Sequence, residues 1–123
     1  MKKLTVNSVI CNHTTSGPGT DDVFFMHQSD GGAPLRYPST SVYEMNKGDS
    51  QVLTPAGGPG MIIYYEYGCF ISAWDHDGPL NQLNPSDIIG NIGLQADAGS
   101  GNYTLQDNDS ADYTLNITVE DAS

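Results

Sequence analysis

Residues Cys69–Leu94 read CFISAWDHDGPLNQLNPSDIIGNIGL and decide the fold: an alternating strand, a polar loop, then a second apolar strand. Successive side chains of a β-strand point to opposite faces of the sheet. One face of the first strand therefore carries Ile71, Ala73, Asp75 and Asp77, and the other carries Phe70, Ser72, Trp74 and His76. The chain turns at Gly78-Pro79 and becomes apolar again after Asp87, which brings a third carboxylate back to the same end of the sheet.

Three carboxylates at the end of one loop repel one another unless a cation neutralises them, one of them binds a proton, or they spread into water. Calcium accepts about six to eight oxygen ligands in irregular loops, whereas magnesium requires a near-octahedral cage, so the pattern favours calcium. The stretch is not an EF-hand, because counting from Asp75 places Pro79 and Leu80 where that loop needs an acidic or amide residue and a glycine. The alternative, that Asp77 and Asp87 only form turns, stays open.

The 123 residues predict one domain over residues 1–123. Apolar residues recur with period two in short runs, and no window of helical length keeps helical spacing. We therefore expect an all-β fold, an eight-stranded antiparallel β-sandwich. The segments that read as strands or extended chain are Leu4–Cys11, Val23–His27, Leu35–Tyr43, Gln51–Thr54, Met61–Tyr67, Cys69–Asp77, Ile88–Leu94, Tyr103–Leu105 and Tyr113–Val119.

The 15 acidic and 4 basic residues give a formal net charge of −11, which argues against a role in binding nucleic acid. Lys2 and Lys3 precede an apolar run, but Thr5 and Asn7 interrupt that run with strand-like alternation, so we expect a strand and no signal peptide. No stretch has the length of a transmembrane helix. These features predict a cytoplasmic or peripheral membrane protein.

The two cysteines are predicted to be free thiols. Cys11 ends the first predicted strand and Cys69 begins the strand that leads to Asp77, so the two fall near opposite ends of the sandwich. At about 3.3 Å per residue, their separation is on the order of 15 to 20 Å, which no disulfide bridges. Free thiols fit a reducing compartment or indifference to redox state.

Neither a zinc site nor a catalytic site is expected. Of the three histidines only His76 lies among the aspartates, and strand alternation sends it to the face opposite Asp75 and Asp77. No cysteine and histidine form a recognisable nucleophile motif. We therefore expect a protein that is not an enzyme.

Three features, in this order along the chain, carry a family resemblance. They are an opening strand with Leu4, Val6 and Val9, a Gly-x-Asp at Gly19–Asp21, and Asp75-x-Asp77 followed by Asp-Ile-Ile-Gly at Asp87–Gly90. Together they resemble the C2 domain, the calcium- and phospholipid-binding β-sandwich of synaptotagmins and protein kinase C. The resemblance implies the permuted (type II) topology, whose last strand is Tyr113–Val119.

In C2 domains calcium lies between the first and third loops and is bound by aspartates from both. Carried over to this chain, the resemblance implies as metal ligands Asp21, its neighbour Asp22 as an alternate, Asp75, Asp77 and Asp87. Backbone carbonyls near Trp74 or His76 would complete the shell, and the third loop, which is longer than usual in the family, offers the side chain of Asn84 as a further oxygen donor. The earlier aspartate of loop one would fall near Thr14 or Thr15, so one carboxylate of the usual set is missing. The lysine-rich strand patch of many members is also absent.

The resulting hypothesis is a calcium-binding C2-like module that attaches to phospholipid headgroups or to a protein partner. Leu80 and Leu83 would then either enter the membrane once calcium screens the aspartates, as loop tips of family members do, or pack back on their own loop. The alternative is a structural or self-assembling sandwich, a homo-oligomer in which calcium stabilises loops or subunit contacts. Calcium-assisted sugar binding by the Asp/Asn-rich loop is a third hypothesis.

Overall fold

The computed structural model describes residues 1–15, 20–53, 60–76, 88–106 and 110–122. Within these ranges every regular element is a β-strand. The strands are β1 (Lys2–His13), β2 (Asp21–Ser29), β3 (Leu35–Tyr37), β4 (Tyr43–Met45), β5 (Ser50–Val52), β6 (Met61–Tyr65), β7 (Gly68–Asp75), β8 (Ile88–Gln95), β9 (Gly101–Gln106) and β10 (Asp112–Asp121). The predicted all-β class is confirmed.

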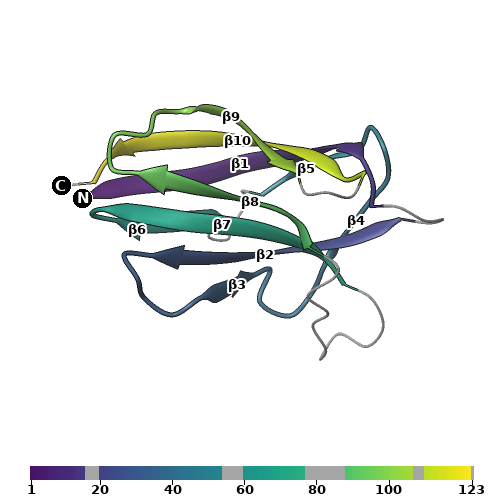
Figure 1. The fold of residues 1–123 in the computed structure, drawn as a ribbon, viewed down its shortest axis with the longest axis horizontal. Coiled ribbons are helices and arrows are strands. Elements are labelled where there is room, and N and C mark those ends of the chain that lie inside the picture. Colours follow the sequence, from purple (N-terminus) through teal and green to yellow (C-terminus); the bar gives the residue numbers. More distant parts are fainter. Residues whose placement is uncertain (16–19, 54–59, 77–87, 107–109, 123) are drawn as a thin grey trace.

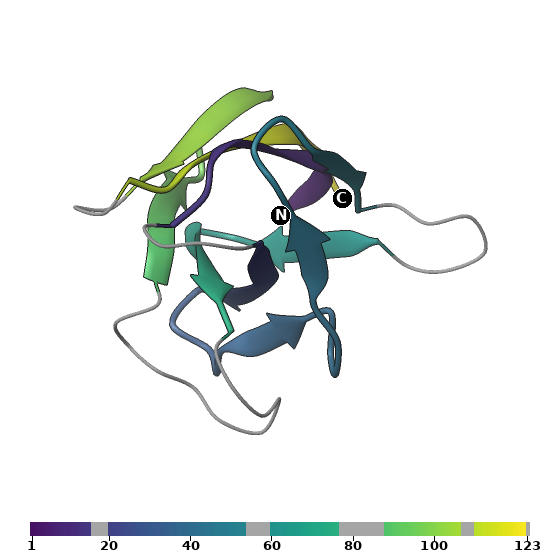
Figure 2. The ribbon, with the colours of Figure 1, turned by 90° about the vertical axis from the view of Figure 1, so that its right-hand side faces the viewer.

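The strands form two antiparallel sheets that lie one over the other (Figures 1 and 2). The first sheet has the order β5-β1-β10-β9, with β6 also paired to β1; the second has the order β3-β2-β7-β8, with β4 also paired to β2. We call them the first and second sheet throughout. The predicted β-sandwich is therefore correct.

The described residues form ten strands, whereas the sequence predicted eight. Strands β5 and β6 pair with different halves of β1, Ser8–Ile10 and Lys2–Val6. Strands β4 and β3 pair in the same way with successive halves of β2, Asp21–Val23 and Phe25–His27. Each pair of short strands thus fills one edge position, so the sandwich has eight strand positions, four in each sheet.

The core lies between the sheets and is built from alternate residues of the strands. In β10 Tyr113, Leu115 and Ile117 are buried, as the alternation predicted. In β1 the alternation changes phase, because Leu4 and Val6 are buried and then Val9. The pairing of β1 with β10 shifts register between Val6 and Ser8, and one extra residue in a strand reverses which side chains face inward.

Both termini lie at one end of the sandwich, where β1 begins and β10 ends (Figure 1). The Ala122 N–H donates to the Met1 carbonyl at 3.0 Å, and Lys2 forms an ion pair with Asp121 at 2.7 Å. The opposite end, where β1 and β7 finish and β2 starts, carries Asp21, Asp22 and Asp75 of the predicted metal ligands. We call it the loop end.

Both thiols are free, as predicted, and both are buried. Cys11 pairs with Tyr113 near the loop end, whereas Cys69 pairs with Ser29 at the other end of β7. Burial raises the pKa of both thiols, that of Cys69 to about 11. At neutral pH both groups are therefore protonated side chains of the core.

Candidate metal centre

Strand register brings Asp21, Asp75 and Thr15 together at the loop end. Asp21 is the first residue of β2, and Asp75 is the last residue of β7, where it pairs with Val23 of β2. Thr15 follows the end of β1 by two residues. Because β2 and β7 are antiparallel neighbours, the start of β2 and the end of β7 lie at the same end of the sheet.

The Thr15 hydroxyl lies between the two carboxylates. Its Oγ1 is 2.6 Å from Oδ1 of Asp21 and 3.1 Å from Oδ2 of Asp75. A hydroxyl carries one proton, so it can donate to only one of these oxygens at a time. Oxygen atoms from two strands that are distant in the sequence thus converge on one point.

Asp21 accepts further hydrogen bonds from the Thr15 backbone and from the first sheet. The carboxylate is 2 % exposed, and the Thr15 N–H donates to Oδ2 at 2.9 Å. The Tyr113 hydroxyl, from β10 of the first sheet, donates to the same oxygen. Burial and the neighbouring Asp21 carboxylate raise the pKa of Tyr113 well above its usual value, so the phenol remains a donor.

At the same end of the sandwich, the Asp75 carboxylate accepts a hydrogen bond from the backbone of β2. The Asp22 N–H donates to Oδ1 of Asp75 at 2.8 Å, and the His76 N–H donates to the Asp22 carbonyl at 2.8 Å. Asp22 follows Asp21 in the strand, so its side chain points to the other face of the second sheet. The structure therefore brings together Asp21 and Asp75 and leaves the Asp22 carboxylate on the opposite side.

His76 and Trp74 lie on the outer face of the second sheet, as alternation predicted for their side chains. His76 is 4 % exposed, and its ring packs edge-on against Phe24 with centroids 5.9 Å apart. Phe24 pairs with Trp74 across β2 and β7. The two side chains thus face away from the Asp75 carboxylate, and their proposed contribution to a metal through backbone carbonyls stays a prediction.

The other predicted site residues lie outside the described residues: Asp77, Leu80, Leu83, Asn84 and Asp87. Within the part of the chain that the structure describes, no three His, Cys, Asp or Glu side chains form a metal-binding group. The cluster that the described residues form therefore consists of two carboxylates and one hydroxyl.

The chemistry of these donors fits calcium. All three side chains offer oxygen, and Oδ1 of Asp21 and Oδ2 of Asp75 face the same hydroxyl. Calcium is a hard cation that takes hydroxyl, carbonyl and carboxylate oxygens. Since about six to eight oxygens are needed, the rest of the shell has to come from water, backbone or residues outside the described set.

Sequence reasoning missed Thr15 as a contact of both aspartates, and it missed Tyr113 altogether. The signal for Thr15 was present, because the resemblance placed the missing loop-one aspartate near Thr14 or Thr15. The signal for Tyr113 was weaker. A tyrosine on the inward face of a strand needs a hydrogen-bond partner for its hydroxyl, and a buried carboxylate needs donors.

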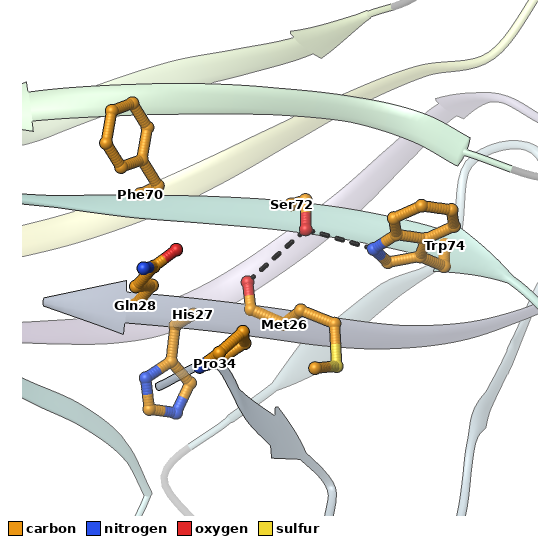
Figure 3. Close-up of a pocket in the computed structure, with 7 residues that line it drawn as sticks. All are labelled: Met26, His27, Gln28, Pro34, Phe70, Ser72 and Trp74. Atoms are coloured by element: carbon orange, nitrogen blue, oxygen red, sulfur yellow. Dashed lines mark hydrogen bonds between the residues drawn. The ribbon is translucent and has the colours of Figure 1, made fainter. Parts of the chain in front are cut away.

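A separate groove of about 290 Å³ crosses β2 and β7 on the outer face of the second sheet (Figure 3). The Trp74 indole N–H donates to Oγ of Ser72 at 2.9 Å, and Phe70 is 64 % exposed. The lining residues are Met26, His27, Gln28, Pro34, Phe70, Ser72 and Trp74. Trp74 therefore belongs to this groove and not to the carboxylate cluster.

Comparison with known proteins relates this geometry to a known fold. No family model matches the chain, and no curated protein matches it. A solved structure described as "Structure of a C2 domain" is similar over 98 % of this chain and 97 % of its own, with 15 % identity and a TM-score of 0.59. None of the residues that the structure describes forms an apolar helix of membrane-spanning length. At this identity the likeness concerns the fold, and the chain is a C2-like β-sandwich.

Proposed function

We propose that this protein is a calcium-dependent binding module whose ion sits at the loop end between Asp21 and Asp75. The observation that carries the proposal is the position of Thr15 Oγ1, 2.6 Å from one carboxylate and 3.1 Å from the other. Two carboxylates that close repel each other, and a divalent cation relieves the repulsion. The C2-like fold supports the same location, since calcium in C2 domains lies between the first and third loops.

Three described side chains would hold the ion: Asp75, Asp21 through Oδ1, and Thr15 through its hydroxyl oxygen. The sequence predicts that Asp77 and Asp87 supply further carboxylates. A bound calcium ion supplies positive charge in a protein of formal net charge −11. The module then attracts anionic groups that it would otherwise repel.

The test is calorimetric titration with calcium after exhaustive treatment with EDTA. The wild type is expected to bind, and Asp75→Asn is expected to bind at least about tenfold more weakly, because a ligand charge is lost. Asp97→Asn is the matched control, since Asp97 is exposed in the turn after β8 and makes no part of the cluster. Equal calcium affinities for the wild type and Asp75→Asn would contradict this site.

The expected partner is an anionic phospholipid surface. The basic residues Lys2 and Lys3 lie at the end opposite the cluster and pair with Asp121 and Glu120, so they do not supply a lipid-binding patch beside it. Sedimentation with phosphatidylserine vesicles should therefore pellet the protein in calcium and leave it in the supernatant in EDTA. If the protein does not pellet in excess calcium, phospholipid is excluded as the partner and a protein partner remains.

One observation favours a second candidate, a structural or self-assembling sandwich in which calcium stabilises loops or subunit contacts. Asp21 is 2 % exposed and accepts hydrogen bonds from Thr15 and Tyr113, so the loop end is already linked within the protein. Light scattering separates the two candidates. A particle size that grows with calcium, without vesicle binding, supports assembly.

A further inference from the structure

The hydroxyl of Tyr113 reaches from one sheet of the sandwich to the carboxylate of Asp21 in the other. Tyr113 lies on β10, where it pairs with Cys11, and Asp21 lies on β2. Tyr113 is fully buried and Asp21 is 2 % exposed. Their hydrogen bond is therefore a polar contact inside an otherwise apolar layer, between strands that are not neighbours in either sheet.

The two oxygens of Asp21 have different surroundings. Oδ2 accepts from the Tyr113 hydroxyl, and the Thr15 N–H is shared between Oδ2 at 2.9 Å and Oδ1 at 3.2 Å. Oδ1 lies 2.6 Å from Thr15 Oγ1, which in turn lies 3.1 Å from Asp75. A carboxylate held at one oxygen has its rotation about the Cβ–Cγ bond restricted, so the other oxygen keeps one direction.

We infer that Tyr113 is a positioning residue for the metal centre, acting through Asp21 and never touching the ion. By holding Oδ2, it directs Oδ1 towards Thr15 and Asp75 before any ion arrives. Groups that hydrogen-bond to metal-ligating carboxylates orient them, and their loss typically lowers metal affinity by about 10- to 100-fold. The inference rests on the proposed calcium site and assigns part of its affinity to a residue of the first sheet.

The experiment compares Tyr113→Phe with Tyr65→Phe. Both tyrosines are fully buried in the core, and both changes remove only a hydroxyl. The Tyr65 hydroxyl has no hydrogen-bond partner among the described residues, so Tyr65→Phe controls for the effect of removing a buried phenol oxygen. Calcium affinity is measured by calorimetry at a temperature where all three proteins are folded, and melting temperature is measured in EDTA.

Tyr113→Phe is expected to weaken calcium binding by about tenfold or more and to melt earlier than Tyr65→Phe in EDTA. A spectroscopic signature accompanies this result. The buried Tyr113 hydroxyl proton should give a slowly exchanging NMR resonance that Tyr113→Phe lacks and that moves when calcium is added to the wild type.

Two results would overturn the inference, and they differ in what else they affect. If the wild type binds calcium and Tyr113→Phe binds it equally well, Tyr113 does not position the site, while the proposed calcium binding stands. If the wild type itself binds no calcium, the proposed function fails and the role of Tyr113 towards an ion fails with it.

Discussion

Replacing Gly90 with alanine is expected to lower the free energy of unfolding by about 3 kcal/mol or more, the upper part of the range for overpacked cores. Gly90 lies in β8, at the outer position of the second sheet, and is buried. A Cβ atom there would lie 2.4 Å from the Gln106 nitrogen and 2.8 Å from the Leu105 carbonyl carbon. Both are backbone atoms of β9 in the first sheet, so no side-chain rotation relieves the overlap.

Thermal unfolding of a graded series checks this prediction. At Gly93 an added Cβ would meet the Phe70 ring at 3.0 Å, and that ring is 64 % exposed and free to swing away. At Gly99 nothing lies within 4 Å. We expect Gly90→Ala to melt on the order of 10 °C earlier than the wild type, Gly93→Ala slightly earlier, and Gly99→Ala within about 0.5 kcal/mol of it. Equal melting temperatures for Gly90→Ala and Gly99→Ala would show that β8 and β9 are not in contact at Gly90.

Gly90 also shows what the sequence could and could not predict about the fold. In the Asp-Ile-Ile-Gly motif at Asp87–Gly90, the sequence predicted a calcium ligand at Asp87 and a strand from Ile88 onward. The structure gives its glycine a packing role, which is to let the outer strands of the two sheets close one side of the sandwich. Strand alternation reports which residues face the core, but it carries no information about which strands from different sheets approach each other.

The strand pattern was predictable because a half-buried strand alternates whatever it pairs with. The long strands were found within a few residues, among them the region of β10, whose buried Tyr113 and Leu115 confirm the alternation. The short strands β3 and β4 were not separated, because three residues are too few to show a period: one extended segment, Leu35–Tyr43, was predicted, which covers β3 and only the first residue of β4. Strand alternation did not predict the register shift in β1 either. The shift is caused by one extra residue near Asn7, which interrupts the pairing with β10.

The candidate site was predictable in part. Asp75 followed from its place near the end of an alternating strand, and Asp21 followed only from the family resemblance, because no local pattern connects residue 21 with residue 75. Their meeting at Thr15 depends on the antiparallel pairing of β2 with β7. Hydrogen bonds such as that of Tyr113 to Asp21 join strands of different sheets, and a single sequence has no periodicity that reports them.

Removal of the Asp21 carboxylate is the second change that we expect to destabilise the protein strongly. Asp21→Ala is expected to lower the free energy of unfolding in EDTA by about 2 to 4 kcal/mol, because buried donors lose their acceptor. Those donors are the Thr15 N–H, the Thr15 hydroxyl and the Tyr113 hydroxyl. Urea unfolding measures the loss, and Asp22→Ala serves as the control, since the Asp22 side chain lies on the opposite face of β2. We expect that control to stay within about 0.5 kcal/mol of the wild type.

Whether Asp21→Ala raises or lowers the free energy of unfolding in EDTA distinguishes two roles for the Asp21 carboxylate. If Asp21 matters mainly as a charge beside Asp75, its removal in EDTA relieves repulsion and should stabilise the protein. If it matters mainly as an acceptor, the removal should destabilise it. The structure favours the second role, since Asp21 is 2 % exposed and accepts bonds from two segments of the chain. Adding calcium should then stabilise the wild type, by about 2.7 kcal/mol at a hundred times the dissociation constant, and Asp21→Ala far less. An Asp21→Ala protein that is more stable than the wild type in EDTA would contradict the acceptor role.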